Sequence, residues 1–478
     1  MFKKISSFAL LFFMLTNFSA CRTKSGQTKE PKAKTDAVEL VIWNLDDAQE
    51  VFLGQFQAYQ SKHPNLKISY KKFTDPIEYE KVLLNAIAEG EGPDIMAIPN
   101  NWVAKNWKKL APYPVGGTTI PLNPQIYADT FFNVASQDLV RDGQIYAIPL
   151  FIDSLALYYN KQLFRDNIPN SDKPGETWEE IRAQAEMLTR TDNSFSRFAL
   201  SGIAMGEDNI LYFSDLFQAL MMQYGVNLWG LDGTKSIIAE KQGIIEGTGK
   251  AYYPLSEALS FYTSFAKSNY KNYTWNAAVT ADSSLSAQET TPFLRQKVAM
   301  FFAYSDMYER LKNMRKQMQT IGESVIKEDD IGVIEFPQIL SSEASTKRDA
   351  FAKYNALAVS RNSKNADYAW DLIQNLSSKD SLLDYHKKTN KPTSRKDLVD
   401  EQMLEPIYGV FARQASYAKT WDIKVNADFF VTQIQNAVYQ DLRFLQDLNK
   451  ITSTWQRRMD CQREKKLSWG KLVWIVLI

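Results

Sequence analysis

The sequence predicts an α/β fold in which strands and helices alternate along the chain. Short apolar runs without polar alternation, such as 40–43, are typical of strands buried on both faces of a sheet. Segments with apolar side chains at helical spacing follow these runs, and Gly and Pro mark their ends. This alternation predicts a mostly parallel sheet, with ligand sites at the carboxyl ends of its strands.

Local signals place the first elements. The expected strands are 40–43, 66–70 and 94–98, with helical segments between them. Asp46 and Asp47 favour a helix start, because acidic side chains stabilise a first helical turn. Gly90 is expected to end the second helix. Further along, Thr177 and Glu180 have the spacing of a capping box at a helix start.

The N-terminus has the features of a secretion signal. Lys3 and Lys4 precede an apolar stretch at 5–18, which is too short to span a membrane, and two small residues lead into Cys21. This arrangement resembles a bacterial lipoprotein signal, in which residues 1–20 are removed and the cysteine is lipidated. The alternative is an ordinary secretory signal with an incidental cysteine. The lipoprotein interpretation predicts an extracytoplasmic protein that a lipid on Cys21 anchors to the cell envelope.

The composition limits the class of protein. Residues 21–37 are polar and without apolar period, so we expect a flexible tether before a folded body that begins near Val38. Cys461 is the other cysteine, which excludes a disulfide framework, and 478 residues predict two or more domains. Removing the two lysines with the signal changes the formal charge from +1 to −1. A net charge this close to zero gives no electrostatic reason to expect binding to nucleic acid.

A series of short motifs carries a family resemblance. They are Trp43 after the first strand, SKHPNLKI at 61–68, AEGEGPDI at 88–95, GQIYAIP at 143–149, LALYYNK at 155–161, KVAMFF at 297–302, ADYAW at 366–370, NKPTS at 390–394 and FARQA at 411–415. In this order they resemble family 1 extracellular solute-binding proteins, the sugar-type receptors of ABC transporters that include maltose-binding protein. The resemblance extends over roughly residues 38–440.

The resemblance implies a two-lobed, periplasmic-binding-protein-like α/β fold. Each lobe would be a mostly parallel sheet flanked by helices, and hinge crossovers would join the lobes near 147–153, 351–356 and 391–396. The implied division is 38–149 plus 354–395 for lobe 1, and 150–353 plus 396–460 for lobe 2. Residues 461–478 form an atypical C-terminal tail with an apolar part at 467–478. This part is either a terminal strand, a membrane-surface patch or, as we favour, the product of a frameshifted reading frame.

The same resemblance implies a ligand site between the lobes. A sugar presents hydroxyl edges to carboxylates and amides, and apolar faces to aromatic rings. The positions that match the family's ligand contacts are Trp43, Asn44, Asp46, Asn100, Asn101, Trp102, Asp153, Tyr304, Ser305, Asp306 and Trp421. The alternative is that the aromatic rings pack in the core and the polar side chains form caps and turns. Asp306 stands where the family often has an aromatic residue.

The predicted function is that of a receptor, which binds a sugar or oligosaccharide and delivers it to ABC-transporter permease subunits. We expect a monomer without cofactor, metal or catalytic residues. His63 and His386 are the two histidines; neither belongs to a recognisable motif, and His386 is expected at a helix surface. A lipid-anchored carbohydrate-active hydrolase with a carboxylate pair is the alternative, and a surface adhesin is a third interpretation.

The lipid anchor is tested by Cys21→Ser. This variant should abolish labelling with a radioactive fatty acid and block signal processing, because the thiol that accepts the lipid is missing. Detergent-phase partitioning of labelled cells measures the result, with Cys461→Ser as the matched control that keeps its label. Unchanged labelling of Cys21→Ser would contradict the lipoprotein interpretation.

Overall fold

The computed structural model describes residues 37–114, 121–192, 197–233, 235–245, 247–281, 289–339, 348–421, 427–443 and 450–462. Cys21, almost all of the predicted tether and the tail beyond residue 462 lie outside these ranges. Among the helices in the described ranges, none combines the length and apolar character needed to cross a membrane.

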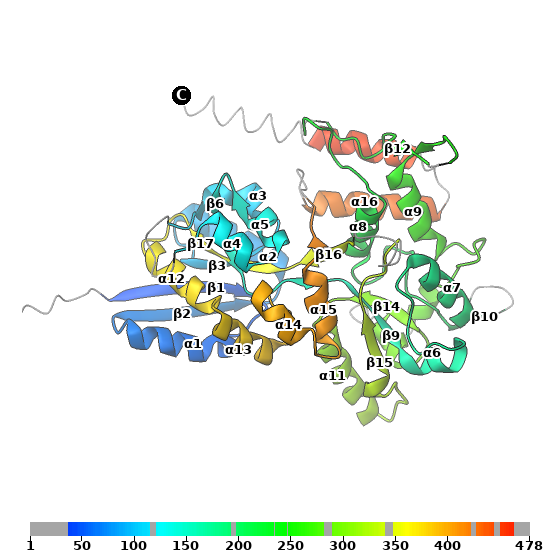
Figure 1. Ribbon diagram of the computed structural model, residues 1–478, viewed down its shortest axis with the longest axis horizontal. Coiled ribbons are helices and arrows are strands. Elements are labelled where there is room, and N and C mark those ends of the chain that lie inside the picture. The colour runs from blue at the N-terminus through cyan, green and yellow to red at the C-terminus, as the bar shows by residue number, and fades with distance from the viewer. Residues whose placement is uncertain are drawn as a thin grey trace, which may run out of the picture. The chain divides into compact units, whose positions relative to one another are not determined.

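The first sheet contains the three strands predicted near the N-terminus (Figure 1). Its strands are β1 (Val38–Leu45), β2 (Leu66–Phe73), β3 (Ile95–Pro99), β4 (Leu110–Ala111), β7 (Ala147–Pro149) and β17 (Asn355–Ser360). The order is β2-β1-β3-β17-β4, and β7 also pairs with β17. β1 runs parallel to β2 and β3, as the alternation of strands and helices predicts. β17 is antiparallel to its three neighbours.

Helices α1 (Gln49–Lys62), α2 (Pro76–Glu89), α12 (Ala366–Leu376) and α13 (Lys379–Thr389) pack around this sheet. α1 and α13 lie side by side, although more than 300 residues separate them in sequence (Figure 1). α2 ends at Gly90, whose φ of 80° is left-handed, as predicted. The expected start of α1 at Asp46 and Asp47 is wrong, because Ala48 is the N-cap and Asp46 adopts a left-handed turn.

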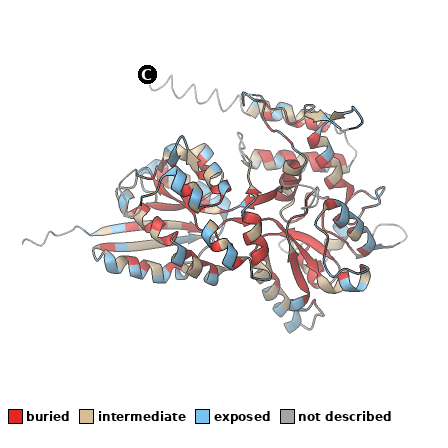
Figure 2. Ribbon diagram, viewed as in Figure 1, coloured by how far each residue is buried: buried red, intermediate tan, exposed pale blue. Residues whose placement is uncertain are grey.

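The second sheet consists of β9 (Ala156–Asn160), β14 (Met300–Ala303) and β15 (Ile331–Ile334). β9 lies between the other two and is antiparallel to both, so the predicted mostly parallel pairing does not hold in this sheet. β14, helix α11 (Met307–Thr320) and β15 still form a strand–helix–strand unit with two parallel strands. Figure 2 shows the strands of this sheet as buried, whereas β2 at the edge of the first sheet is partly exposed.

Most of the other helices lie in the long segments between the sheet strands. They are α3 (Trp102–Asn106), α4 (Pro124–Thr130), α5 (Asn133–Leu139), α6 (Lys161–Asn167), α7 (Trp178–Leu188), α8 (Phe213–Gln223), α9 (Pro254–Ser264), α10 (Thr290–Leu294), α14 (Val399–Gln402), α15 (Tyr408–Ala415) and α16 (Ala427–Leu442). The predicted capping box at Thr177 and Glu180 opens α7. Residues 450–462 are also helical. Short strand pairs are β5 (Val140–Arg141) with β6 (Gln144–Ile145), β10 (Arg190–Thr191) with β11 (Phe198–Leu200), and β12 (Gly243–Ile244) with β13 (Ala251–Tyr252).

A small sheet, here called the connecting sheet, consists of β8 (Asp153–Ser154), β16 (Ala350–Lys353) and β18 (Ala418–Lys419). In sequence, β8 lies between β7 of the first sheet and β9 of the second, and β16 lies between β15 and β17. The chain therefore passes between the two larger sheets through paired strands. The third crossover is predicted at 391–396, so the residues after it would belong to lobe 2. Leu398, however, still packs in the core of the first sheet. The lobe boundaries themselves stay a prediction.

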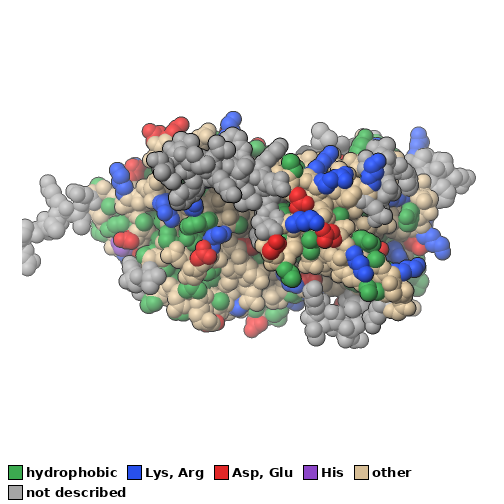
Figure 3. Space-filling model, turned by 90° about the horizontal axis from the view of Figure 1, so that it is seen from above, with side chains coloured by type: hydrophobic (Ala, Val, Ile, Leu, Met, Phe, Trp, Pro, Cys, Tyr) green, Lys and Arg blue, Asp and Glu red, His purple; other side chains and the backbone are tan. Residues whose placement is uncertain are grey.

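Charged side chains of both signs are interspersed on the face shown in Figure 3. The buried pair of Lys267 and Asp441 is different, because both side chains are less than a tenth exposed. Lys267 Nζ lies 2.6 Å from Asp441 Oδ2, and Thr263 donates a hydrogen bond to the same oxygen. This pair ties the segment after α9 to the C-terminal end of α16.

Asp441→Ala should lower the free energy of unfolding by about 3–5 kcal/mol, because it leaves the buried ammonium of Lys267 without its carboxylate. Urea denaturation followed by circular dichroism measures this change. Lys235→Ala is the control, since its pair with Glu240 is exposed and should contribute nothing measurable. Equal effects of the two variants would contradict the argument.

Candidate functional site

A polar cluster lies where the end of β14 meets the connecting sheet. Asp153, on β8, has a side chain that is only 6% exposed. Its Oδ2 accepts hydrogen bonds from the Ser305 hydroxyl at 2.6 Å and the Ser305 backbone N–H at 3.1 Å. Its Oδ1 accepts from the Ser154 backbone N–H at 2.8 Å. These contacts hold the end of β14 against the connecting sheet.

The Asp153 carboxyl has an unusual affinity for protons. Burial raises its pKa to about 7, the hydrogen bond from the Ser305 hydroxyl opposes this change, and the nearby Asp306 carboxylate adds to it. A carboxyl with a pKa this high is poised between its two protonation states at neutral pH. The protonated carboxyl can donate a hydrogen bond, whereas the ionised form can only accept hydrogen bonds.

Tyr304 links this carboxyl to a second one. Its hydroxyl donates to Asp215 Oδ2 at 3.0 Å, and Lys353 Nζ lies 3.1 Å from the same oxygen. Lys353 is the cross-strand partner of Asp153 in the connecting sheet, so the register of β8 and β16 brings the two side chains to one place. The Tyr212 ring packs edge-on against Tyr304, with 4.9 Å between the ring centroids.

Two residues of this region hold the left-handed backbone conformation that favours glycine. Asp46 has a φ of 75° and Tyr212 a φ of 58°. Such conformations cost about 1–3 kcal/mol each in a non-glycine residue, and they cluster at ligand sites. Asp142, Asn170 and Gln296 hold the same conformation outside this region, so position, and not the backbone, assigns Asp46 and Tyr212 to the candidate site.

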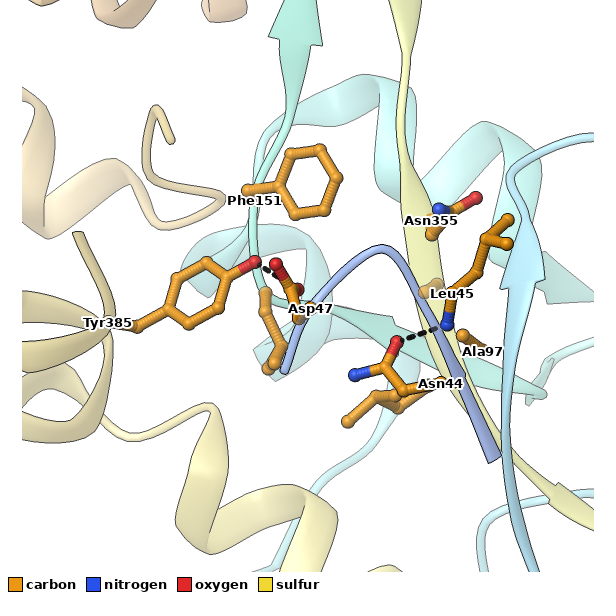
Figure 4. A pocket seen from close by; sticks show the side chains of 10 residues that line it. Asn44, Leu45, Asp47, Ala97, Phe151, Asn355 and Tyr385 are labelled. Carbon is orange, nitrogen blue, oxygen red and sulfur yellow. Dashed lines mark hydrogen bonds between the residues drawn. The ribbon is translucent and has the colours of Figure 1, made fainter. Parts of the chain in front are cut away.

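On the side of the first sheet, Asp47 organises a second polar group. Its carboxylate accepts hydrogen bonds from Lys391 Nζ and the Tyr385 hydroxyl, each at 2.7 Å. Figure 4 shows Tyr385 and Asp47 pointing toward one another in a small pocket that Asn44 and Asn355 also line. The pocket has about 10 Å³ of space, enough for one water molecule and too small for a sugar.

Electrostatics couples the two groups. Desolvation is the largest cause of a raised pKa at Asp46, the carboxylates of Asp47 and Asp306 add to it, and the Lys391 ammonium opposes it. Asp46 follows β1 of the first sheet, whereas Asp306 follows β14 of the second. Carboxylates from both sheets therefore act on one another, as expected for a site built by both.

The structure brings together the predicted residues Asp153, Tyr304, Ser305 and Asp306, and Asp46 joins them electrostatically. Sequence reasoning missed Tyr212, Asp215 and Lys353. One signal was available for Asp215, which lies in the first turn of the apolar helix α8. A carboxylate buried with such a helix needs a polar partner, so a buried polar contact could have been predicted there.

The other six predicted residues lie outside this cluster, and most of them have contacts of their own. Trp43 is half-buried against Phe73, with 5.3 Å between ring centroids, and Asn44 is buried. The Asn100 side chain donates a hydrogen bond to Asp138. Asn101 is the N-cap of α3 and makes no side-chain capping hydrogen bond. Trp102 is 2% exposed, and its indole N–H donates to Glu80. Trp421 donates to the Gln218 backbone carbonyl at 3.3 Å. Ligand contact by these six residues stays a prediction.

Neither histidine belongs to a catalytic arrangement. The expected surface position of His386 is wrong, since it is 6% exposed, with its ring nitrogens 2.8 Å from the Lys391 carbonyl and from Glu405. His63 packs between Tyr59 and Tyr368. Across the described residues, no three His, Cys, Asp or Glu side chains come together as a metal site would require.

Comparison with known proteins decides the family. A family model for bacterial extracellular solute-binding proteins matches residues 54–406. The chain belongs to this family. Its members bind solutes and are not enzymes, which sets the hydrolase interpretation aside. This solute-binding protein is 21% identical to a binding protein of Brucella abortus (strain 2308) over 327 residues, 68% of this chain and 67% of that protein.

Solved structures give the fold. The sugar-binding protein MalE of Xanthomonas citri matches with a TM-score of 0.69 at 16% identity, covering 91% of this chain and 99% of that chain. An ABC-transporter solute-binding protein of Thermotoga lettingae, bound with α-D-tagatose, matches with a TM-score of 0.64 at 18% identity and covers 89% and 99%. These matches confirm the predicted periplasmic-binding-protein-like α/β fold.

Asp153→Asn should flatten the pH dependence of stability between about pH 4 and 7. The folded state keeps a proton up to about pH 7 that the unfolded chain releases near the ordinary pKa of 3.8. Raising the pH through this window therefore destabilises the wild type by about 1.4 kcal/mol per pH unit for this group. The stability of Asp153→Asn should not fall in this way as the pH rises, because the asparagine side chain does not ionise.

Urea denaturation at several pH values between about 5 and 7 measures the difference in slope between wild type and variant. Asp142→Asn is the control, because the Asp142 side chain is 77% exposed. An identical slope for wild type and Asp153→Asn would show that Asp153 ionises normally.

Proposed function

We propose that this solute-binding protein is the receptor of an ABC importer and captures a sugar or oligosaccharide. The observation that supports this most strongly is the cluster of Asp153, Tyr212, Asp215, Tyr304 and Lys353, which combines carboxylates, a cation and aromatic rings beside the connecting sheet. The sugar ligands and names of the similar proteins point the same way.

The chemistry of the cluster suits a carbohydrate. Hydroxyl groups both donate and accept hydrogen bonds, so they match Asp153, which gains or loses a proton near neutral pH, and the Lys353 ammonium, whose side chain is 58% exposed. Tyr212 is partly exposed, and its ring can cover an apolar sugar face. Tyr304 is 5% exposed and acts mainly by holding Tyr212 and Asp215 in place.

The proposed mechanism uses the connecting sheet as a hinge between two lobes. Asp46 and Asp306 would contribute from opposite lobes, and their mutual repulsion favours an open state until ligand hydroxyls bridge them. Closure around the ligand would then create the surface that the permease subunits recognise. A lipid on Cys21 would hold the receptor near the permease in the membrane.

The proposal is tested by a thermal-shift screen of mono- and oligosaccharides, followed by calorimetric titration of each sugar that stabilises the protein. A ligand at 100 times its Kd adds about 2.7 kcal/mol of stability. Incubation with the same sugar should leave it uncleaved. Absence of any stabilising sugar, or cleavage of the bound sugar, would overturn the proposal.

Tyr212→Ala should weaken binding of the identified sugar by about 2 kcal/mol, roughly thirtyfold in Kd, because it removes an aromatic face from the site. Tyr439→Ala is the matched control, since Tyr439 is 43% exposed on α16 and its ring packs against the Arg443 guanidinium. Calorimetric titration gives both affinities. Equal affinities of the two variants would place the sugar away from Tyr212.

A further inference from the structure

Glu289 is a buried carboxyl outside the polar cluster described above. The residue is fully buried at the N-cap of the five-residue helix α10, where its side chain makes no capping hydrogen bond. Its Oε1 instead accepts a hydrogen bond from the Leu211 backbone N–H at 2.9 Å, across 78 residues of sequence. Its Oε2 is buried and finds no donor among the described residues. The side chain therefore reaches beyond its own helix to residue 211.

A carboxyl in this position is costly for the fold. Burial raises the pKa of Glu289 to about 7, whereas the N–H groups of Glu289 and Leu211 and the Arg310 guanidinium oppose this rise. An apolar side chain of similar length would fill the same space without a buried polar group. The hydrogen bond to Leu211 is what such a side chain could not provide.

Leu211 immediately precedes Tyr212, whose ring is proposed to cover a sugar face. Tyr212 is the N-cap of α8, has a left-handed φ of 58° and makes no side-chain capping hydrogen bond. This conformation is unfavourable for a residue with a Cβ atom, so neighbouring contacts must hold it. The Asp215 N–H donates to the Tyr212 carbonyl at 3.0 Å, which fixes the turn on its helix side. The Glu289 carboxyl holds the turn on the other side, through Leu211.

Apolar packing joins the same turn to α10. Ile210 is 3% exposed and belongs to one buried apolar cluster with Phe293 of α10, and Leu211 and Tyr212 pack against this cluster. On the side of the candidate site, the Tyr212 ring meets Tyr304 edge-on at 4.9 Å. α10 therefore supplies both an apolar base and a hydrogen-bond acceptor for the turn that carries the Tyr212 ring.

We propose that Glu289 is a positioning residue that holds, through the Leu211 N–H, the turn that presents the Tyr212 ring to a sugar. The sugar in this inference rests on the proposed function, whereas the placement of Tyr212 is a property of the protein without ligand. The acceptor oxygen does the positioning rather than the negative charge, because an amide oxygen can accept the same N–H.

Hydrogen exchange and fluorine NMR of the protein without sugar test the placement. Glu289→Met has a side chain of similar length without a good acceptor, so the Leu211 amide should exchange at least about tenfold faster than in the wild type. The same variant should shift the signal of fluorotyrosine at position 212, which is identified by its loss in Tyr212→Phe. Glu289→Gln should keep the wild-type exchange rate and signal. Equal effects of Glu289→Gln and Glu289→Met would overturn the proposal.

Calorimetric titration with the sugar selected by the thermal-shift screen tests the consequence for binding. Glu289→Met should weaken the affinity about tenfold, whereas Glu289→Gln should bind as the wild type does. In a Tyr212→Ala background, Glu289→Met should cost no further affinity, because both changes act through one ring. A loss of equal size in that background would show that Glu289 supports the fold in general, and would overturn the proposal.

Gln456→Met is the matched control. Gln456 Oε1 also accepts a long-range backbone N–H, that of Ala239 at 2.9 Å, and its loss should change neither the Leu211 exchange nor the Tyr212 signal. If circular dichroism shows that Glu289→Met is unfolded, Glu289→Leu takes its place. Unchanged Leu211 exchange, an unchanged Tyr212 signal, or equal changes in the control would overturn the proposal. Failure of every sugar to bind would instead contradict the proposed function.

Discussion

The pairing of β8 with β16 is the constraint on which the site depends. These two strands carry Asp153 and Lys353 as cross-strand partners, and they are also the segments through which the chain passes between its two larger sheets. A polar cluster fixed to such strands moves with any rotation of one sheet against the other. In the proposed function, ligand binding and hinge motion would therefore depend on the same pairing of β8 with β16.

Elements with local causes could be predicted from the sequence. The strands β1 to β3, the glycine that ends α2 and the capping box of α7 each depend on residues a few positions apart. The antiparallel place of β9 between β14 and β15 could not be predicted, because pairing across about 140 to 180 residues leaves no local signal. The start of α1 was misplaced since two acidic residues suit a turn as well as a first helical turn.

The difference between local signals and long-range contacts also explains which site residues could be predicted. Asp153, Ser305 and Asp306 follow or form strand ends, where the resemblance placed ligand contacts, and the structure joins them. Lys353 and Asp215 became visible only through contacts across 138 residues of sequence. Trp102 makes a contact that sequence position did not suggest, because the folded chain buries its ring and its indole N–H donates to Glu80. Ligand contact by Trp102 stays a prediction.

The buried carboxyl of Asp153 weakens the fold at neutral pH. Its nearest partners are Ser305 and Ser154, which donate hydrogen bonds but carry no positive charge. At neutral pH, no ion pair therefore offsets the free-energy cost of burying the ionised form. In the proposed function, the hydroxyl groups of a ligand would add hydrogen bonds at that point. Part of the stability lost through burial of this carboxyl would then return as binding free energy.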